Sequence, residues 1–272
     1  MNLSPSGARA RRVRASETRS GAEGAAMIAG AAARNAPPRR IPPEMLDGYT
    51  MGGRVRIIDS YRDDSVAPDA PTRYTREQFD AWMHDAEQRL SKFYDKTDEY
   101  LYTALDAHPI GGAHVAVFGS TRPWYESIAL ARGAARITII DYNPPVVEHP
   151  SVDTMHPSEL AARSAKFDAA FSISSFEHDG LGRYGDPLNP DADIDAMRTV
   201  ARALCSGSLL FLAVPVGIDT VVWNRHRVYG RHRLPLLLNG WERVGAFGFT
   251  EQDLELDRWS PVHQPILALR SQ

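Results

Sequence analysis

The sequence predicts an α/β protein built on a doubly wound, mostly parallel sheet with an N-terminal helical extension. Two short apolar runs, Ala169–Ser174 and Leu209–Pro215, are too continuous to alternate between a wet and a dry face. Such runs are typical of parallel strands that helices cover on both faces. Between them, apolar residues recur at helical spacing from Ile194 to Leu204, which predicts an amphipathic helix. The three segments form a strand–helix–strand crossover.

From His114 onward, strand-like and helix-like segments alternate, as expected for such a sheet. The first strand ends in Gly119, and the helix after it has Pro123 in its first turn, where proline is tolerated. The second strand ends on Asp141. The remaining predicted elements are a short strand at Ser151–Met155, a helix starting at Pro157, an unassigned segment at Arg227–Asn239, and two last strands at Trp241–Phe247 and Pro265–Arg270.

Residues 1–40 are expected to form a disordered tail. They hold eight arginines, Glu17 and Glu23 as the only acids, and almost no large apolar side chains. Such a segment cannot bury enough surface to offset the entropy lost on ordering. The alternatives are an organellar transit peptide, an arm for nucleic acid, and a translation start placed too early, with Met27, Met45 or Met51 as the true first residue.

Residues 41–110 are expected to form an extension that covers the sheet. A strand-like piece, Val55–Asp59, lies in a region rich in proline, glycine and aspartate. Thr75 and Gln78 have the spacing of a capping box, and apolar and aromatic residues follow every three to four positions to about Ala107. This pattern predicts one or two long amphipathic helices, whose aromatic stripe either packs as core or lid or contacts a substrate. Residues 111–272 then form the sheet domain.

Composition excludes several classes of protein. The net charge of −3 lacks the strongly basic character of a nucleic-acid-binding domain, so no nucleic-acid partner is predicted. Cys205 is the only cysteine, which excludes an intrachain disulfide and favours a reducing, cytoplasmic compartment. No apolar run approaches 18 residues, so no membrane span is predicted. The expected partner is a small molecule, and the oligomeric state stays open.

Gly119 and Asp141 form the first chemical pattern. A glycine after a strand lets a ligand approach the backbone, and the following helix offers free N–H groups to an anion. Asp141 lies 22 residues later, where an acid at a strand tip commonly binds a ribose diol. The loop has one glycine instead of the three of a dinucleotide site, which argues against NAD and FAD. A simple tight turn at Gly119 and a cap at Asp141 are the structural alternatives.

The loop after the strand that ends near Ser174 is unusually polar. It places Ser174, Ser175, Glu177 and His178 at the carboxyl end of a strand, where open parallel sheets bind their ligands. An imidazole is a suitable proton acceptor at neutral pH, so His178 is the candidate catalytic base, with Glu177 beside it to orient it or to contact the acceptor. Alternatively, His178 caps the loop through backbone hydrogen bonds.

Residues 223–233 form a basic cluster with four arginines and two histidines. The cluster either binds an anionic substrate, such as a phosphate or a sugar nucleotide, or pairs with the acidic loop at residues 177–195 and holds it shut. No close histidine spacing typical of a metal site occurs, so no metal is predicted. The candidate substrate-binding residues of the cluster and the polar loop are Arg183, Tyr184, Asn224, His226 and Arg227.

Two resemblances follow from these motifs. The run from Ser174 to His178, the helix after it, the turn at Cys205–Ser208 and the strand ending in Val-Pro resemble class I S-adenosylmethionine-dependent methyltransferases. The run GLGRYGDPLNPDADIDAM, together with VPVG, WNRHRVYG, RLPLLL and GWE, resembles the domain of unknown function family 268 over about residues 50–270. That family is placed among methyltransferase-like Rossmann folds, so the resemblance implies this fold.

The methyltransferase resemblance also implies a cofactor site. S-adenosylmethionine would be the cofactor, held by Gly119 and Ser120 at its methionine part, Asp141 at its ribose, and Ser174 and Ser175 on the floor, with Glu177 and His178 facing the methyl group. The acceptor would be small and polar, such as a sugar or glycan precursor, and methylated on oxygen, because the signature of many N-methylating enzymes is absent.

The first loop departs from the methyltransferase pattern. It carries Arg122, Pro123 and Trp124 where further glycines are usual. Either these bulky residues clash with the cofactor, or Arg122 meets the cofactor carboxylate. The second functional hypothesis is therefore a non-catalytic domain that binds a nucleotide-like ligand or a partner protein.

Overall fold

The computed structural model describes residues 36–62, 64, 70–259 and 263–272. Asn35–Gln272 form one compact unit. The tail predicted for residues 1–40 lies outside the described residues as far as residue 35. Among the helices of the described ranges, none combines the length and the apolar character needed to cross a membrane.

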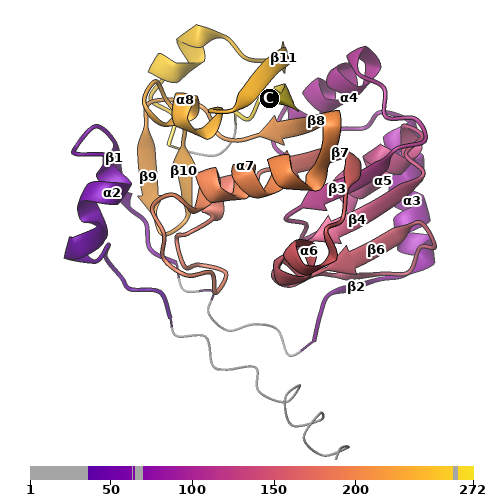
Figure 1. The fold of residues 1–272 in the computed structure, drawn as a ribbon, viewed down its shortest axis with the longest axis horizontal. Helices are drawn as coiled ribbons and strands as arrows, with labels where there is room; N and C mark the ends of the chain where they lie inside the picture. Colours follow the sequence, from indigo (N-terminus) through magenta and orange to yellow (C-terminus); the bar gives the residue numbers. More distant parts are fainter. Residues whose placement is uncertain (1–35, 63, 65–69, 260–262) are drawn as a thin grey trace, which may run out of the picture. The chain divides into compact units, whose positions relative to one another are not determined.

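A seven-stranded sheet forms the centre of this unit (Figure 1). Its strand order is β11-β12-β8-β7-β3-β4-β6. β12 runs antiparallel to both of its neighbours, and the other adjacent pairs are parallel, so the predicted mostly parallel sheet is confirmed. The strands are β3 (His114–Phe118), β4 (Arg136–Ile140), β6 (Val152–Met155), β7 (Phe167–Ile173), β8 (Leu204–Ala213), β11 (Trp241–Phe247) and β12 (Ile266–Ser271).

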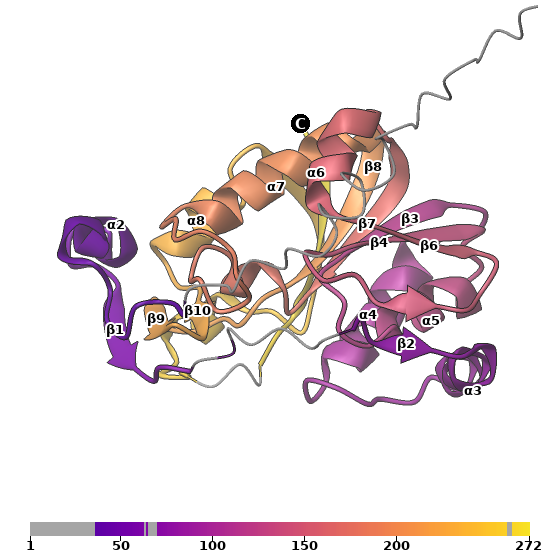
Figure 2. The ribbon, with the colours of Figure 1, turned by 90° about the horizontal axis from the view of Figure 1, so that it is seen from below.

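Helices cover both faces of the sheet, which confirms the doubly wound arrangement (Figure 2). One apolar core joins Val117 and Ile139 of the sheet to the helices that precede or follow β3. The other joins Leu210 and Leu212 to the helices around β7 and β8. The first face carries α3 (Arg76–Glu87), α4 (Thr97–Ala107) and α5 (Trp124–Ala131), and the second carries α6 (Pro157–Arg163), α7 (Ala192–Ala203) and α8 (Arg233–Leu237).

The predicted crossover from β7 through α7 to β8 is present, with one correction. The turn predicted at Cys205–Ser208 is part of β8, which begins at Leu204. The pairing register with β7 shifts between Phe167 and Ala169, so the extra residues are accommodated as an irregularity of the strand. Gly207 has a φ of +80°, which glycine adopts without steric cost.

The N-terminal extension contains two separate helices, α3 and α4. Thr75 and Gln78 form the predicted capping box at the start of α3, which therefore begins where the sequence indicates. Between the helices, Arg89, Tyr94 and Asp95 adopt positive φ angles that non-glycine residues rarely hold. Pro123 is the N-cap of α5 and lies one position earlier than the predicted first turn. A two-stranded parallel pair, β2 (Arg73–Tyr74) and β5 (Val146–Val147), joins the extension to the sheet domain.

A second, three-stranded sheet was not predicted. The strand expected at Val55–Asp59 is present as β1 (Arg56–Asp59), and it pairs in parallel with β9 (Thr220–Trp223). β9 in turn pairs antiparallel with β10 (His226–Val228). The predicted basic cluster therefore lies on a hairpin and at the start of α8. The short elements η1 (Pro43–Met45), α2 (Leu46–Thr50), η2 (Phe176–His178), β5 and η3 (Glu251–Glu255) complete the described chain.

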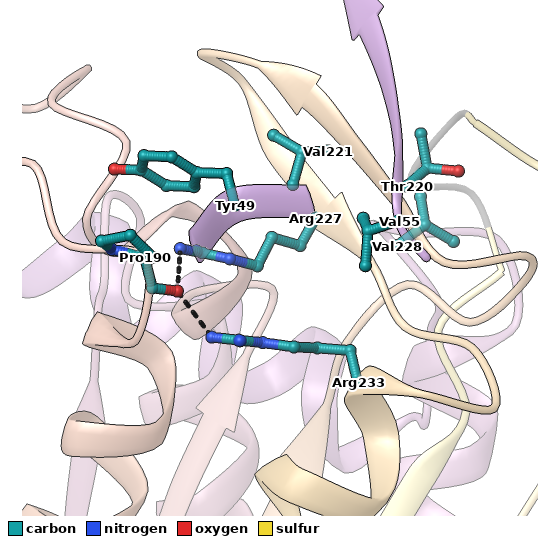
Figure 3. A pocket seen from close by; sticks show the side chains of 8 residues that line it. All are labelled: Tyr49, Val55, Pro190, Thr220, Val221, Arg227, Val228 and Arg233. Carbon is teal, nitrogen blue, oxygen red and sulfur yellow. Dashed lines mark hydrogen bonds between the residues drawn. The ribbon is translucent and has the colours of Figure 1, made fainter. Parts of the chain in front are cut away.

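A buried charge cluster fixes the loop between β7 and α7. Arg227 of β10 and Arg233 of α8 both donate hydrogen bonds to the carbonyl of Pro190, at 3.1 and 2.6 Å (Figure 3). Both guanidinium groups also pair with the fully buried carboxylate of Asp193 in α7, at 3.8 and 2.5 Å. This geometry supports the structural alternative, in which the basic cluster holds the acidic loop shut.

A small cavity lies beside these arginines. Tyr49 and Val55 of the N-terminal segment contribute to its wall (Figure 3). Its volume of about 10 Å³ is enough for one water molecule, so it has no room for a cofactor. It belongs to the packing of the three-stranded sheet against the crossover loop.

The substitution Asp193→Ala is expected to lower the free energy of unfolding by about 3–5 kcal/mol, because it leaves two buried guanidinium groups without their counter-ion. Asp195→Ala on the same helix is the matched control. Asp195 is 55% exposed and pairs with Arg198 at the surface, so the control should lose about 0–1 kcal/mol. Chemical denaturation of both variants measures the difference, and equal losses would contradict the assigned role.

Candidate functional site

The carboxyl ends of β3, β4 and β7 bring the predicted cofactor residues together. The chain leaves β3 toward β4 on one side, whereas β7 lies on the other side of β3, so the strand order reverses between β3 and β7. Ligands of open α/β sheets bind at such a switch point. Ser120 contacts Asp141 across β3 and β4, and Gly119 lies against Ser175 across β3 and β7. Ser174 completes the set at the end of β7.

Asp141 links two loops at this edge. Its carboxylate accepts the backbone N–H of Ser120 at 3.0 Å and the backbone N–H of Asn143 at 2.6 Å. These two hydrogen bonds fix Asp141 at the tip of β4, the position at which ribose binding is predicted from the sequence.

Gly119 is required by two local constraints. Its φ angle is +72°, a conformation that side chains strain. A Cβ atom at this position would lie 2.0 Å from Ser175 Oγ and 2.7 Å from Ser175 Cβ. The loops after β3 and β7 thus approach each other as closely as a glycine permits.

Glu177 and His178 lie in η2, directly after β7. Glu177 is fully buried, and its Oε1 accepts a hydrogen bond from Ser174 Oγ at 2.7 Å. Its Oε2 is buried without a hydrogen-bond partner. His178 Nδ1 lies against the carbonyl of Arg225, which can only accept, so Nδ1 carries the proton and Nε2 holds a lone pair. Nε2 lies 3.7 Å from Glu177 Oε1.

Burial shifts the pKa values of this pair in opposite directions. It raises the pKa of Glu177 to about 7, although the hydrogen bond from Ser174 and the charge of Arg227 act against the rise. It lowers the pKa of His178 to about 3, despite the bond to the Arg225 carbonyl. His178 is consequently neutral at physiological pH, whereas Glu177 changes its charge there. Of the two predicted catalytic residues, Glu177 has the pKa that suits a proton acceptor.

Glu126 is a candidate functional residue that was not predicted from the sequence. It lies in the first turn of α5, is fully buried, and has no hydrogen-bond partner on either carboxylate oxygen. Burial raises its pKa to about 7, and the charge of Asp141 acts in the same direction. The available signal was an acid inside the otherwise apolar stretch WYESIALA, since a buried unpaired acid is costly and rarely retained for packing.

The bulky residues of the first loop contact the N-terminal extension. Trp124 is fully buried, and its indole N–H donates to Asp98 of α4 at 2.8 Å. Arg122 lies over the ring of Phe93 at 5.5 Å. Asp98 also accepts the backbone N–H groups of Lys92 and Phe93, which fixes the segment between α3 and α4. The departure from a glycine-rich loop thus provides a docking point for the extension.

The predicted substrate residues divide into two groups. Tyr184 and His226 lie close to His178, with ring centroids at 5.6 and 6.4 Å. Arg183 pairs with Asp64 at 2.7 Å, and Arg227 belongs to the buried cluster around Asp193. Asn224 is fully buried in the turn between β9 and β10, where its Oδ1 accepts the backbone N–H of Arg62 at 2.9 Å.

Two further residues reach the end of β7 from outside the predicted set. Gln264 donates to Ser174 Oγ at 3.0 Å. Tyr94, from the segment between α3 and α4, also hydrogen bonds to Ser174, and burial together with the nearby Glu177 keeps its pKa raised. Among the described residues, no group of three histidine, cysteine or acidic side chains is placed to hold a metal ion.

Comparison with known proteins gives a family. The family model of the Caenorhabditis protein of unknown function DUF268 matches residues 112–264. No curated protein matches the sequence. The strand order is that of the class I methyltransferase-like Rossmann fold predicted from the sequence.

Solved structures with a related arrangement have low sequence identity to the chain. A protein of Streptococcus thermophilus, ascribed to the hemolysins, has 11% identity over 67% of this chain and 69% of its own, at a TM-score of 0.40. SMU.776, to which methyltransferase activity is ascribed, was solved with SAH and has 9% identity over 66% of this chain, at a TM-score of 0.44. The chain spans 50% of its length.

A third structure is from Listeria monocytogenes, and S-adenosylmethionine-dependent methyltransferase activity is ascribed to it. It has 13% identity over 71% of this chain and 99% of its own, at a TM-score of 0.41. At these identities and TM-scores, no site residue transfers from these structures.

Substitution of Gly119 tests the close approach of the two loops. Gly119→Ala is expected to lower the free energy of unfolding by about 2–4 kcal/mol, from backbone strain plus the overlap with Ser175. Gly207→Ala has a similar positive φ and no atom within 4 Å of the new Cβ, so it should lose only about 1–2 kcal/mol. Denaturant titration compares the two variants. If Gly119→Ala is no more destabilised than the control, the contact with Ser175 is not tight in solution.

Proposed function

The chain belongs to DUF268, the family described as Caenorhabditis protein of unknown function, and we propose from the site geometry that it is an S-adenosylmethionine-dependent methyltransferase. The proposed acceptor is small and polar, with a sugar or glycan precursor as the preferred class, and it is methylated on oxygen. The observation that carries the proposal is the switch-point arrangement, in which Asp141 is fixed against the Gly119 loop and the buried Glu177, with a pKa of about 7, follows the neighbouring strand β7. A reducing, cytoplasmic setting is part of the same proposal.

The residues at this edge fit the cofactor in chemical type. Asp141 offers acceptors to the ribose hydroxyls, and the hydroxyl of Ser120 is buried without a hydrogen-bond partner. Gly119 has no side chain, and the bulky side chains of Trp124 and Arg122 have their partners in the N-terminal extension. We therefore assign Gly119, Ser120, Asp141, Ser174 and Ser175 to cofactor binding.

The proposed chemistry divides the work between cofactor and protein. When bound, S-adenosylmethionine supplies an electrophilic methyl group. On transfer the sulfur–methyl bond would break and S-adenosylhomocysteine would leave. The chain's own part would be to take the proton of the acceptor hydroxyl onto Oε2 of Glu177, the carboxylate oxygen without a partner. Ser174 holds the other oxygen in place through its 2.7 Å hydrogen bond. A carboxyl with a pKa of about 7 is half ionised at neutral pH, so it can accept and release this proton in each cycle.

His178 has a positioning role in this proposal. Its Nδ1–H is fixed on the Arg225 carbonyl, and its low pKa keeps Nε2 unprotonated. A lone pair beside Glu177 disfavours the carboxylate and favours the protonated acid. In this proposal His178 lies beside Glu177 and Glu177 is the base, which exchanges the roles expected from the sequence, where His178 was the base.

A non-catalytic domain that binds a nucleotide-like ligand is the second candidate. The contact between Gly119 and Ser175 favours this second candidate, because the contact brings the loops after β3 and β7 together at the edge where a cofactor would lie. The two candidates differ in whether S-adenosylmethionine binds at all.

Calorimetric titration with S-adenosylmethionine and S-adenosylhomocysteine tests cofactor binding. Asp141→Ala is expected to weaken binding by roughly 1–3 kcal/mol, about 5- to 150-fold, because ribose hydroxyls lose their acceptor. Asp153→Ala removes an exposed acid of β6 in the same sheet and should leave the affinity unchanged. Absence of binding at millimolar ligand would overturn the methyltransferase proposal. Wild-type affinity in Asp141→Ala would remove that residue from the site.

The pKa of Glu177 gives a pH prediction that needs no known acceptor. Its folded-state pKa of about 7 lies above the ordinary value of 4.5, so the folded state binds this proton more tightly than the unfolded state. The free energy of unfolding therefore falls as pH rises from about 4.5 to 7. Glu177→Gln removes this contribution and should become more stable than the wild type by about 3 kcal/mol above pH 7, with no gain near pH 4.

Denaturation at pH 4 and pH 8 measures the effect, and Glu242→Gln, an exposed acid paired with Arg270, is the control that should follow the wild type. Once an acceptor is found, turnover should rise with pH through about 7, and Glu177→Gln should reduce it roughly 10²- to 10⁴-fold. A wild-type turnover in Glu177→Gln would exclude Glu177 as the proton acceptor.

A further inference from the structure

The four arginines of the basic cluster differ in what surrounds their side chains. Arg227 and Arg233 are buried and use their donors on Asp193 and on loop carbonyls. Arg231 is exposed and pairs with Glu255. Arg225 forms no ion pair within the described part of the chain. Its Nη1 lies 3.4 Å from Ser60 Oγ, and its Nε is buried without a hydrogen-bond partner.

The neighbouring residue repeats this pattern. Asn224 is fully buried, and its Oδ1 accepts the backbone N–H of Arg62. Its Nδ2 has no hydrogen-bond partner. Two adjacent residues of the β9–β10 turn therefore carry buried N–H donors without an acceptor. A buried donor left unpaired costs about 1–3 kcal/mol, and more when it is charged, so their combination indicates an acceptor that arrives with a ligand.

The nearby carboxyl groups do not neutralise this turn. Asp64 pairs with Arg183 at 2.7 Å and with Arg62 at 3.2 Å. Asp186 accepts backbone N–H groups of Gly182 and Tyr184. Burial raises the pKa of Asp179 well above its ordinary value and so disfavours its negative charge. The positive charge of Arg225 is thus available to a ligand.

The turn is also fixed next to the proposed methyl-transfer site. The carbonyl of Arg225 receives the Nδ1–H of His178, and His178 adjoins Glu177. His226 follows Arg225 in the chain, and its ring lies 6.4 Å from the ring of His178. A group bound by the turn would consequently lie beside the residues that handle the acceptor proton.

We infer that Arg225 and the side-chain amide of Asn224 bind an oxyanion of the acceptor, a phosphate or a carboxylate. A guanidinium group and an amide together present several N–H donors, and charge-assisted hydrogen bonds to an oxyanion are the strong ones. The inference rests on the proposed function for the statement that the anion belongs to a methyl acceptor. Binding of the anion itself is independent of that function.

Titration of the full chain with inorganic phosphate, followed by calorimetry at constant ionic strength, tests the site. The wild type should bind phosphate saturably, and Arg225→Gln should weaken this binding at least about tenfold, since it removes a charge-assisted contact. Arg231→Gln removes the same charge from an exposed position of the same cluster and should change the affinity less than about twofold. Equal effects of both variants, or no saturable binding by the wild type, would overturn the inference.

A second variant and a second ligand keep the result specific. Arg225→Lys retains the charge and loses the fork of donors, so its affinity should lie between those of the wild type and Arg225→Gln. This variant decides the matter if Arg225→Gln lowers the melting temperature. Parallel titration with acetate distinguishes a carboxylate site from a phosphate site.

The S-adenosylmethionine titration separates failure of this inference from failure of the proposed function. Phosphate binding that depends on Arg225 without any cofactor binding would leave the anion site standing and remove the methyltransferase proposal. Cofactor binding together with phosphate binding that is unchanged in Arg225→Gln would leave the methyltransferase proposal standing and remove the anion site.

Discussion

The fully buried Asp193 is the charge on which the arrangement of the site depends. It is surrounded by Arg227, Arg233 and the hydroxyl of Tyr229, which donates to it at 3.0 Å. Burial alone would raise the pKa of Asp193, but the two arginines hold it below its usual value. Removing one partner would leave a buried charge uncompensated, so the cluster acts as a unit.

This unit ties the second sheet to the crossover loop. Arg227 extends from β10 and donates to the carbonyl groups of Asp179 and Pro190 at the two ends of the loop that follows η2. The carbonyl of Arg225, two residues before Arg227, accepts the hydrogen bond from His178 Nδ1. The hairpin thus fixes both the loop and the histidine beside Glu177. The position of the candidate proton acceptor therefore depends on residues about 50 positions later in the sequence.

How much could be predicted from the sequence follows from the range of the interactions involved. The apolar runs at β7 and β8 and the capping box at Thr75 are local patterns, and they identify the sheet, its crossover and the start of α3. Gly119 and Asp141 follow neighbouring parallel strands, so a shared edge was foreseeable. The three-stranded sheet was not, because β1 and β9 are separated by more than 150 residues and each is only four residues long.

The site residues follow the same division. Residue type alone suggested His178 as the base, since free imidazole titrates near neutral pH. Burial reverses this ranking, for it lowers the pKa of His178 to about 3 and raises that of Glu177 to about 7. The roles of Arg225 and Arg227 could not be separated by sequence either, because only the structure shows that Arg225 lies in the turn between β9 and β10 whereas Arg227 lies in β10.

The single-glycine loop is explained by the extension that covers it. Trp124 donates to the buried Asp98, and Asp98 also binds the backbone of Lys92 and Phe93. A second glycine in place of Trp124 would remove this anchor and leave Asp98, whose pKa is already raised by burial, with fewer donors. The residues of the loop after β3 thus make two separate sets of contacts. Gly119 and Ser120 contact Ser175 and Asp141 of the neighbouring loops, while Arg122 and Trp124 hold the segment that brings Tyr94 to Ser174 and so to Glu177.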